Sequence, residues 1–159
     1  MFNRILIPLD GSRFGSRAIK YAVELAYRFG AKIYLVQVVK PAVPITGSTV
    51  VGPGEDLAAA KTAVQIAQDE DKRNVDKAKR YLQRKSRGIR KHEIDISYEV
   101  LVGNPASSII GFARKHNIDL IVMTSHGKGG LKRAVLGSVA DEVVRESGKP
   151  VLVFNPSAK

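Results

Sequence analysis

The residues best suited to chemistry gather in one glycine- and lysine-rich stretch, Met123 to Val139, between a strand-like apolar run and a helix-like pattern. At the start of a helix the backbone N–H groups are unpaired and the helix dipole is positive, so such a place favours phosphate. Glycines let the backbone approach an anion, cations add charge, and Ser138 offers a hydroxyl. The glycines are Gly127, Gly129 and Gly130, and the cations are Lys128, Lys132 and Arg133. The alternative is a tight loop that holds no ligand.

Catalytic groups and metal ligands are scarce in this sequence. The absence of cysteine removes disulfides, thiolate catalysis and Cys-ligated metal sites. His126 could donate to a phosphate or cap its loop, but no carboxylate partner for acid–base catalysis stands near it in sequence. His92 and His116 look like solvated residues, and no two histidines have metal-ligand spacing. We therefore expect no catalytic residue, and expect any Mg²⁺ or Mn²⁺ to arrive with bound phosphates.

The standard nucleotide fingerprints are also missing. No G-x-x-x-x-G-K-[ST] occurs, and no G-x-G-x-x-G follows the first strand-like run. These absences disfavour a P-loop NTPase and a Rossmann dehydrogenase.

Strand-like apolar runs alternate with helical patterns along the chain, and these elements position the phosphate-favouring stretch. Strands are expected at 4–9, 32–39, 93–102, 119–124 and 150–154, with helices at 12–29, 58–87 and 106–116 and a last helix from 138. Strands that alternate with helices predict an α/β fold, one doubly wound five-stranded parallel sheet with helices on both faces. Its ligands would bind outside the carboxyl ends of the strands. We expect a single domain over 1–159, with a flexible loop at about 41–57.

Local signals mark the starts of three helices. Ser12 is expected to cap the first helix. The pair 104–105, Asn-Pro, is typical of an N-cap followed by the first helical residue. Ser138, with Asp141 three residues later, has the pattern of a capping box.

Composition places the chain among ordinary globular proteins. Hydrophobic residues make up 44% and charged residues 26%, which suggests neither disorder nor a membrane span. The first apolar run is far shorter than the core of a signal peptide and meets Pro8 and Asp10 almost at once. We therefore expect a cytoplasmic protein with no membrane contact.

Positive charge is in excess and concentrated in one segment. Lysine and arginine number 26 against 15 acidic residues, a net charge of +11. On a helix over 61–87, basic residues share a narrow arc opposite apolar ones. The basic set is Arg73, Lys77, Arg80, Arg84 and Arg87, and the apolar set is Val75, Ala78 and Leu82. This basic face is either simply solvated or a docking surface for an acidic partner, nucleic acid or protein.

The stretch from Thr124 resembles the nucleotide-binding signature of the universal stress protein family: a glycine, two residues, a glycine, nine residues, then Gly-Ser or Gly-Thr. Gly127 and the pair 137–138 enclose nine residues and match it. Thr124 departs from it, because it stands where the signature begins with glycine and its β-branched side chain narrows that space. The resemblance covers essentially the whole chain, since 4–12, 100–105 and 150–154 look like the family's opening, middle and closing strands.

The resemblance implies the sheet order 3-2-1-4-5 of an adenine nucleotide alpha hydrolase-like fold, with ATP, ADP or AMP bound at the carboxyl edge. Asp10 would contact the ribose, although aspartate in Asp-Gly-Ser also suits a turn without a ligand. Met123 would lie beside the base or, alternatively, fill the core. Pro8, Leu9 and Val38 would line the adenine, Gly127, Gly137, Ser138 and Val139 would hold the phosphates, and Thr124 and His126 complete the nucleotide-binding candidates.

The last strand carries apolar residues at what the implied order makes a sheet edge. They are Val151, Leu152, Val153 and Phe154. An apolar edge strand exposes unpaired backbone groups, and pairing with a second copy would cover them. The resemblance also implies a homodimer across this strand, whereas a monomer would cover the edge with its tail, 155–159.

Together these observations predict a nucleotide-dependent switch in stress response or signalling. The loop at 41–54 would act as a partly ordered lid, and the bound nucleotide would shift partner binding. Two alternatives stay open at this point. One is a binding module for an acidic partner on the basic face, and the other is slow ATP hydrolysis.

Overall fold

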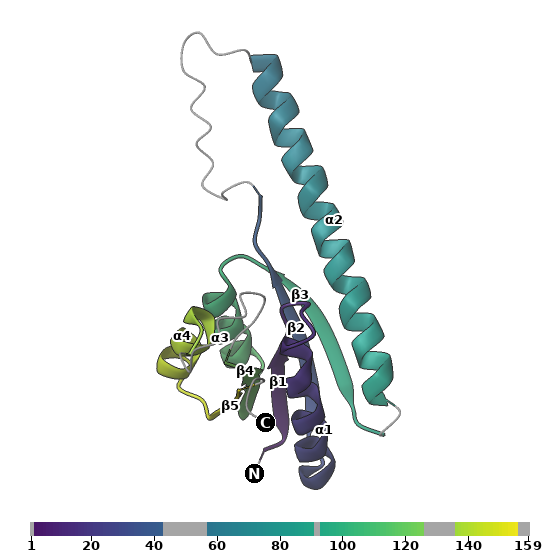
Figure 1. Ribbon diagram of the computed structural model, residues 1–159, viewed down its shortest axis with the longest axis vertical. Coiled ribbons are helices and arrows are strands. Elements are labelled where there is room, and N and C mark those ends of the chain that lie inside the picture. The colour runs from purple at the N-terminus through teal and green to yellow at the C-terminus, as the bar shows by residue number, and fades with distance from the viewer. Residues whose placement is uncertain (1, 43–56, 91–92, 126–135, 156–159) are drawn as a thin grey trace.

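The computed structural model describes residues 2–42, 57–90, 93–125 and 136–155, and its strands and helices alternate as the sequence predicts (Figure 1). In chain order the elements are β1 (Arg4–Pro8), a short 3₁₀ helix (Gly15–Arg17), α1 (Ala18–Phe29), β2 (Lys32–Val39), α2 (Leu57–Arg90), β3 (Ile96–Val102), α3 (Pro105–Lys115), β4 (Leu120–Thr124), α4 (Ser138–Glu146) and β5 (Val151–Phe154). The predicted flexible loop falls almost entirely outside the described residues.

All of these strands form one parallel sheet in the order β3-β2-β1-β4-β5, which confirms the predicted doubly wound fold. Strands covered by helices on both faces need apolar residues at successive positions. β4 meets this need, because each of its 5 residues is buried. β1 lies between β2 and β4, so the segment that follows it stands at the middle of the carboxyl edge.

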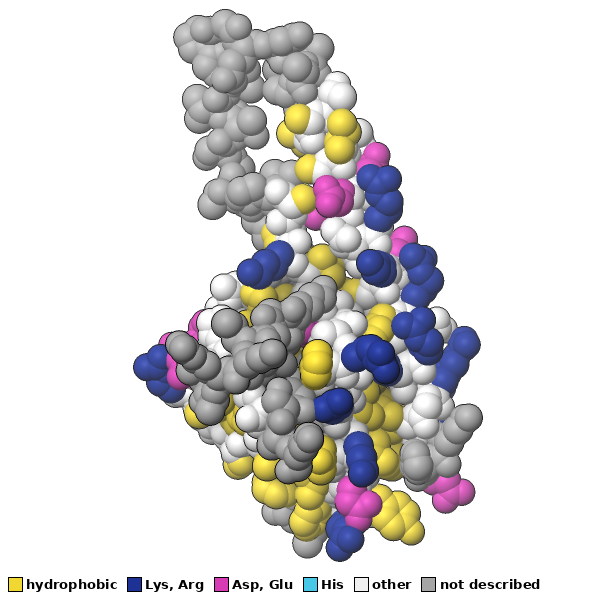
Figure 2. All heavy atoms as spheres, viewed as in Figure 1, with side chains coloured by type: hydrophobic (Ala, Val, Ile, Leu, Met, Phe, Trp, Pro, Cys, Tyr) yellow, Lys and Arg dark blue, Asp and Glu magenta, His cyan; other side chains and the backbone are white. Residues whose placement is uncertain are grey.

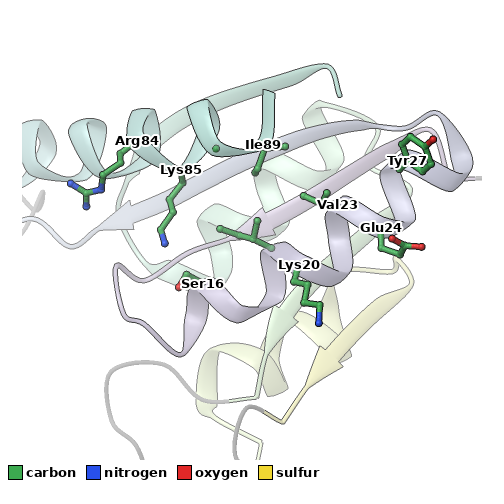
Figure 3. A pocket seen from close by; sticks show the side chains of 10 residues that line it. Ser16, Lys20, Val23, Glu24, Tyr27, Arg84, Lys85 and Ile89 are labelled. Atoms are coloured by element: carbon green, nitrogen blue, oxygen red, sulfur yellow. The ribbon is translucent and has the colours of Figure 1, made fainter. Parts of the chain in front are cut away.

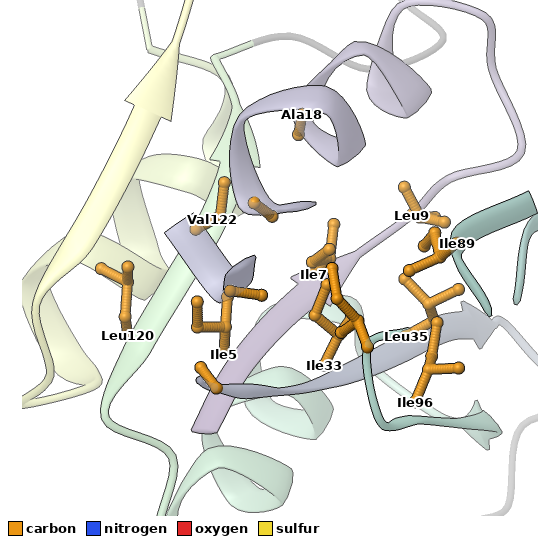
Figure 4. Packing of buried hydrophobic residues seen from close by; sticks show 14 of the residues in the cluster. Ile5, Ile7, Leu9, Ala18, Ile33, Leu35, Ile89, Ile96, Leu120 and Val122 are labelled. Atoms are coloured by element: carbon orange, nitrogen blue, oxygen red, sulfur yellow. The ribbon is translucent and has the colours of Figure 1, made fainter. Parts of the chain in front are cut away.

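Helices cover both faces of the sheet (Figure 1), and each face has its own apolar core. Figure 4 shows the core on the face of α1 and α2. On one face Ala18 of α1 and Leu82 of α2 are fully buried in a cluster with Leu35 of β2. On the other face α3 and α4 contribute buried residues such as Ile110 and Val143. These two cores hold β1 and β4 rigidly and thereby position whatever leaves their carboxyl ends.

α2 is longer than the sheet that it covers. Its 34 residues extend over about 51 Å at about 1.5 Å per residue. Ala78, Leu82 and Ile89 are buried, whereas Ile66 is 58% exposed. The amino-terminal half of α2 therefore projects beyond the sheet, as Figure 1 shows. Among the helices of the described ranges, none is long and apolar enough to cross a membrane.

Two predicted boundaries are wrong. α2 continues through Gly88 to Arg90, because Ile89 is 3% exposed and a continued helix brings its side chain into the core. β3 begins at Ile96 and not at residue 93, because Glu93 has a left-handed backbone with φ of 59°, which ends one element and cannot extend a strand.

The predicted cap of the first helix is also displaced. The hydroxyl of Ser12 accepts a hydrogen bond from the N–H of Gly15 at 2.8 Å, which starts the 3₁₀ helix, and α1 begins only at Ala18. By contrast, the pair 104–105 behaves as predicted. The side-chain oxygen of Asn104 accepts from the N–H of residue 107 at 3.2 Å, and proline is the first helical residue.

The capping box predicted at Ser138 is absent. Gly137 is the N-cap of α4, Ser138 is the first helical residue, and no side chain caps the helix. The reason is that the N–H of Gly137 donates to the carbonyl of Ser125 at 2.7 Å, which turns the chain into the helix one residue early. The carboxylate of Asp141 pairs instead with Arg145, one turn further along α4.

Candidate functional site

The candidate site lies where the carboxyl ends of β1 and β4 meet. The two strands pair in parallel, so their carboxyl ends share one edge of the sheet. Pro8, Leu9 and Asp10 leave β1 at this edge, and Met123 and Thr124 end β4 there. The fold thus brings together candidates that stand far apart in the sequence.

Asp10 has one carboxylate oxygen held by the protein and one left over. Its Oδ1 accepts two hydrogen bonds from Ser12, one from the N–H at 3.0 Å and one from the hydroxyl at 2.7 Å. Its Oδ2 is buried and has no hydrogen-bond partner among the described residues. A buried carboxylate oxygen without a donor is costly, so this atom favours a ligand that carries a hydroxyl or N–H group.

Gly15 allows this arrangement because it has no side chain. A Cβ atom there would lie 2.3 Å from Oδ1 of Asp10 and 3.2 Å from the hydroxyl of Ser12. Carbon and oxygen cannot approach so closely, so any larger residue would push the carboxylate out of its place. Glycine is needed at position 15 because of the limited space, and the orientation of the Asp10 carboxylate depends on that space.

The start of α4 supplies backbone donors near the end of β4. The hydrogen bond from Gly137 to Ser125 ties the two together, and the first bond inside the helix runs from the N–H of Asp141 to the carbonyl of Gly137 at 2.9 Å. The N–H groups of residues 138–140 come before this first donor in the chain, so no carbonyl of the helix accepts from them. Ser138 is exposed, and Val139 is half-buried. This helix start has the properties of an anion site.

The remaining candidates at this edge are more deeply placed. Met123 is 6% exposed and belongs to the core between the sheet and α3 and α4, as the core-filling alternative requires. Val38 of β2 is half-buried against the same core. Thr124 is 8% exposed and pairs across the sheet with Phe154. Contact of these three residues with a nucleotide stays a prediction.

Two of the predicted nucleotide-binding residues, His126 and Gly127, lie outside the described residues, as does His92. The prediction of a solvated His116 is wrong. Its ring stacks on Phe112 with centroids 4.0 Å apart, because the end of α3 packs against the sheet. Within the described ranges, no group of three or more His, Cys, Asp or Glu residues could hold a metal ion.

Sequence reasoning missed Tyr81, which α2 brings to Asp10. Its hydroxyl is buried beside the side chain of Ser16. Burial, and then the negative charge of Asp10, raise the pKa of the Tyr81 hydroxyl above its ordinary value of 10.0. The sequence does place an aromatic residue beside Leu82 on the core side of the helix, but nothing in it shows that this side reaches Asp10.

A Tyr81→Phe variant should differ from wild type mainly at alkaline pH. Because the pKa is raised in the folded protein, the unfolded chain loses the Tyr81 proton first as pH rises past 10.0. The free energy of unfolding of wild type therefore falls with rising pH. The variant lacks this hydroxyl and does not lose stability through it. Urea unfolding should give free energies within about 0.5 kcal/mol of each other at neutral pH, with a difference that grows above about pH 10. Tyr27→Phe, at a position 74% exposed, is the control. Parallel pH profiles for wild type and Tyr81→Phe would contradict this reading.

The basic face predicted on α2 exists. Its five cations are exposed along the helix, and Figure 2 shows dark-blue side chains following α2. Ala78 and Leu82 are buried on the opposite side, and Val75 is half-buried. The periodicity therefore assigned both sides of this helix correctly.

The sequence and the fold are similar to those of known proteins. The family model "Universal stress protein family" matches residues 1–155. The chain belongs to this family. Universal stress protein MJ0531 of Methanocaldococcus jannaschii is 34% identical over 159 residues, which cover 100% of this chain and 85% of that protein.

Solved structures of universal stress proteins share the fold. The structure of MJ0577, from the same organism, has a TM-score of 0.75 at 23% identity and covers 100% of this chain and 99% of its own. A universal stress protein in complex with cAMP has a TM-score of 0.59 at 22% identity, with 98% of both chains covered. At these identities the structural likeness establishes the fold of this universal stress protein.

Proposed function

We propose that this universal stress protein binds an adenine nucleotide, ATP, ADP or AMP, at the carboxyl edge of β1 and β4. The observation that carries the proposal is the buried Oδ2 of Asp10, which has no donor among the described residues. A ribose hydroxyl is a donor of the right kind. The complex of a similar universal stress protein with cAMP supports the adenine nucleotide class.

In this proposal each part of the nucleotide has its own set of residues. The ribose donates to Asp10, and the phosphates meet the amides at the start of α4. Any divalent ion is held mainly through the phosphates. The adenine side comprises Pro8, Leu9, Val38 and Met123, and the phosphate side comprises Thr124, His126, Gly127, Gly137, Ser138 and Val139.

The role proposed for the nucleotide is that of a switch in a cytoplasmic stress response. A bound nucleotide changes the protein only if it binds two conformations with different affinity. Hydrolysis is not needed for such a switch, and the proposal contains no catalytic step.

The first experiment measures the nucleotide content of freshly purified protein, followed by calorimetric titration with ATP, ADP and AMP in the presence of Mg²⁺. We expect bound or titratable adenine nucleotide in wild type. Gly15→Ala should weaken binding by at least about tenfold, because its Cβ displaces the Asp10 carboxylate. Gly111→Ala is the matched control, since a Cβ there meets nothing within 4 Å. Protein free of nucleotide that also gives no heat of titration would refute the proposal.

We further propose a homodimer that pairs through β5. All residues of this edge strand are half-buried in the single chain, so each leaves apolar surface that a second copy could cover. Phe154 is already partly covered by Tyr21, with ring centroids 3.9 Å apart. Sedimentation at twice the mass of 17.3 kDa is the expected result, and a concentration-independent monomer would contradict it.

A further inference from the structure

A groove runs between α1 and α2 on the outer side of the molecule (Figure 3). It has a volume of about 850 Å³, and residues from Ser16 to Tyr27 on one side and from Arg84 to Ile89 on the other line it. Ser16 and Tyr27 are separated by about 16 Å of helix at about 1.5 Å per residue, roughly three turns. The groove therefore has room along its length for a short helix.

Gly88 keeps this groove open. A Cβ added at Gly88 would meet nothing within 4 Å, so the space beside it is empty of protein atoms. Gly88 is inside α2, where glycine weakens the helix by about 1 kcal/mol relative to alanine. Gly88 thus leaves the groove open, although alanine at this position would make the helix more stable.

The floor of the groove is apolar. Ile19 and Val23 of α1 are half-buried there, and Ile89 of α2 is nearly fully buried. These three side chains belong to the margin of the core that α1 and α2 share with the sheet. A partner that inserts apolar side chains would extend this core and remove the remaining surface from water.

The rim of the groove is positive. Lys20, Arg84 and Lys85 line it, and none of them forms an ion pair with another described residue. The one carboxylate of the lining, Glu24, is paired with Arg28 at 2.6 Å. The groove therefore presents cations without acidic partners of its own, which favours an anionic occupant.

We propose that this groove docks an acidic amphipathic helix of a partner protein. Apolar side chains of that helix would contact the floor, and its carboxylates would pair with Lys20, Arg84 and Lys85. A single-stranded nucleic acid fits the groove less well, because successive bases bind by stacking on several rings, whereas the floor is aliphatic and the described lining has one ring, that of Tyr27 at one end. The proposal does not rest on nucleotide binding.

The test uses a defined probe, a fluorescein-labelled helical peptide with leucine at alternating spacings of three and four and glutamate at most other positions. Fluorescence anisotropy should report binding to wild-type protein. Gly88→Leu fills the groove without changing charge and should weaken binding by at least about tenfold. Gly111→Leu, at another open helical glycine outside the groove, should bind as wild type does. Circular dichroism confirms that both variants are folded.

A second pair of variants tests the charge. Lys85→Glu should weaken probe binding about threefold to tenfold, and the loss should shrink at high salt. Lys79→Glu makes the same change of charge at an exposed position of α2 that does not line the groove, so its effect should be clearly smaller.

Four outcomes would overturn the proposal. The first is that the probe does not bind wild type. The second is that Gly88→Leu binds the probe as tightly as wild type does. The third is that a peptide with lysine in place of glutamate binds wild type as well as the probe does. The fourth outcome is that a single-stranded oligonucleotide binds wild type more tightly than the peptide does and that Gly88→Leu weakens this binding. The groove would then be a nucleic-acid site.

Discussion

Asp10→Asn is expected to weaken ATP binding by about tenfold to hundredfold while the free energy of unfolding stays within about 0.5 kcal/mol of wild type. Ser12 donates twice to Oδ1 of Asp10, so the amide oxygen of the variant must take that place. The amide NH₂ then occupies the place of Oδ2 and cannot accept a hydrogen bond from ribose. Calorimetric titration with ATP, together with urea unfolding, separates loss of the contact from loss of the fold.

Deoxynucleotides provide the control for this prediction. If a ribose hydroxyl donates to Asp10, then 2′-deoxy-ATP or 3′-deoxy-ATP binds wild type more weakly than ATP does. The same deoxynucleotide should lose little further affinity for Asp10→Asn, because the two changes remove one shared contact. Equal affinity of wild type and Asp10→Asn for ATP would exclude Asp10 as the ribose ligand.

Leu82→Ala is expected to lower the free energy of unfolding by about 2–5 kcal/mol. The Leu82 side chain is 0% exposed and lies in the core that joins α2 to the sheet. Its truncation removes buried apolar area and leaves a cavity that the neighbouring strands can close only in part. Since domains are stable by only about 5–15 kcal/mol, urea unfolding should show a large shift of the midpoint.

Ile66→Ala is the matched control, because Ile66 belongs to the same helix but is 58% exposed on the projecting half. Its effect should stay within about 0.5 kcal/mol. If Leu82→Ala were as mild as Ile66→Ala, α2 could not be packed on the sheet as described.

The basic face of α2 and the proposed docking groove overlap only in part. Arg84 belongs to the basic face and also lines the groove, whereas Lys85 was not among the five cations of that face. Helical periodicity sorts residues around a single helix axis. It carries no information on the neighbouring helix that supplies the other wall.

Local patterns in the sequence were sufficient for the type and order of the elements. Apolar runs marked the strands, and the pair 104–105 marked the start of α3. The physical reason is that strand alternation, helix periodicity and capping depend on residues within a few positions of one another. The sheet order came from resemblance to a family, and the structure confirms it.

Only the tertiary structure decided which distant residues meet. Tyr81 approaches Asp10 because α2 packs beside the start of α1, and Gly15 leaves room for the Asp10 carboxylate because the turn after β1 folds back on itself. The end of α2 moved to Arg90 because a core position was available for Ile89. Contacts of this kind depend on how whole elements pack, and packing is set by shape and volume across the core, which no local pattern encodes.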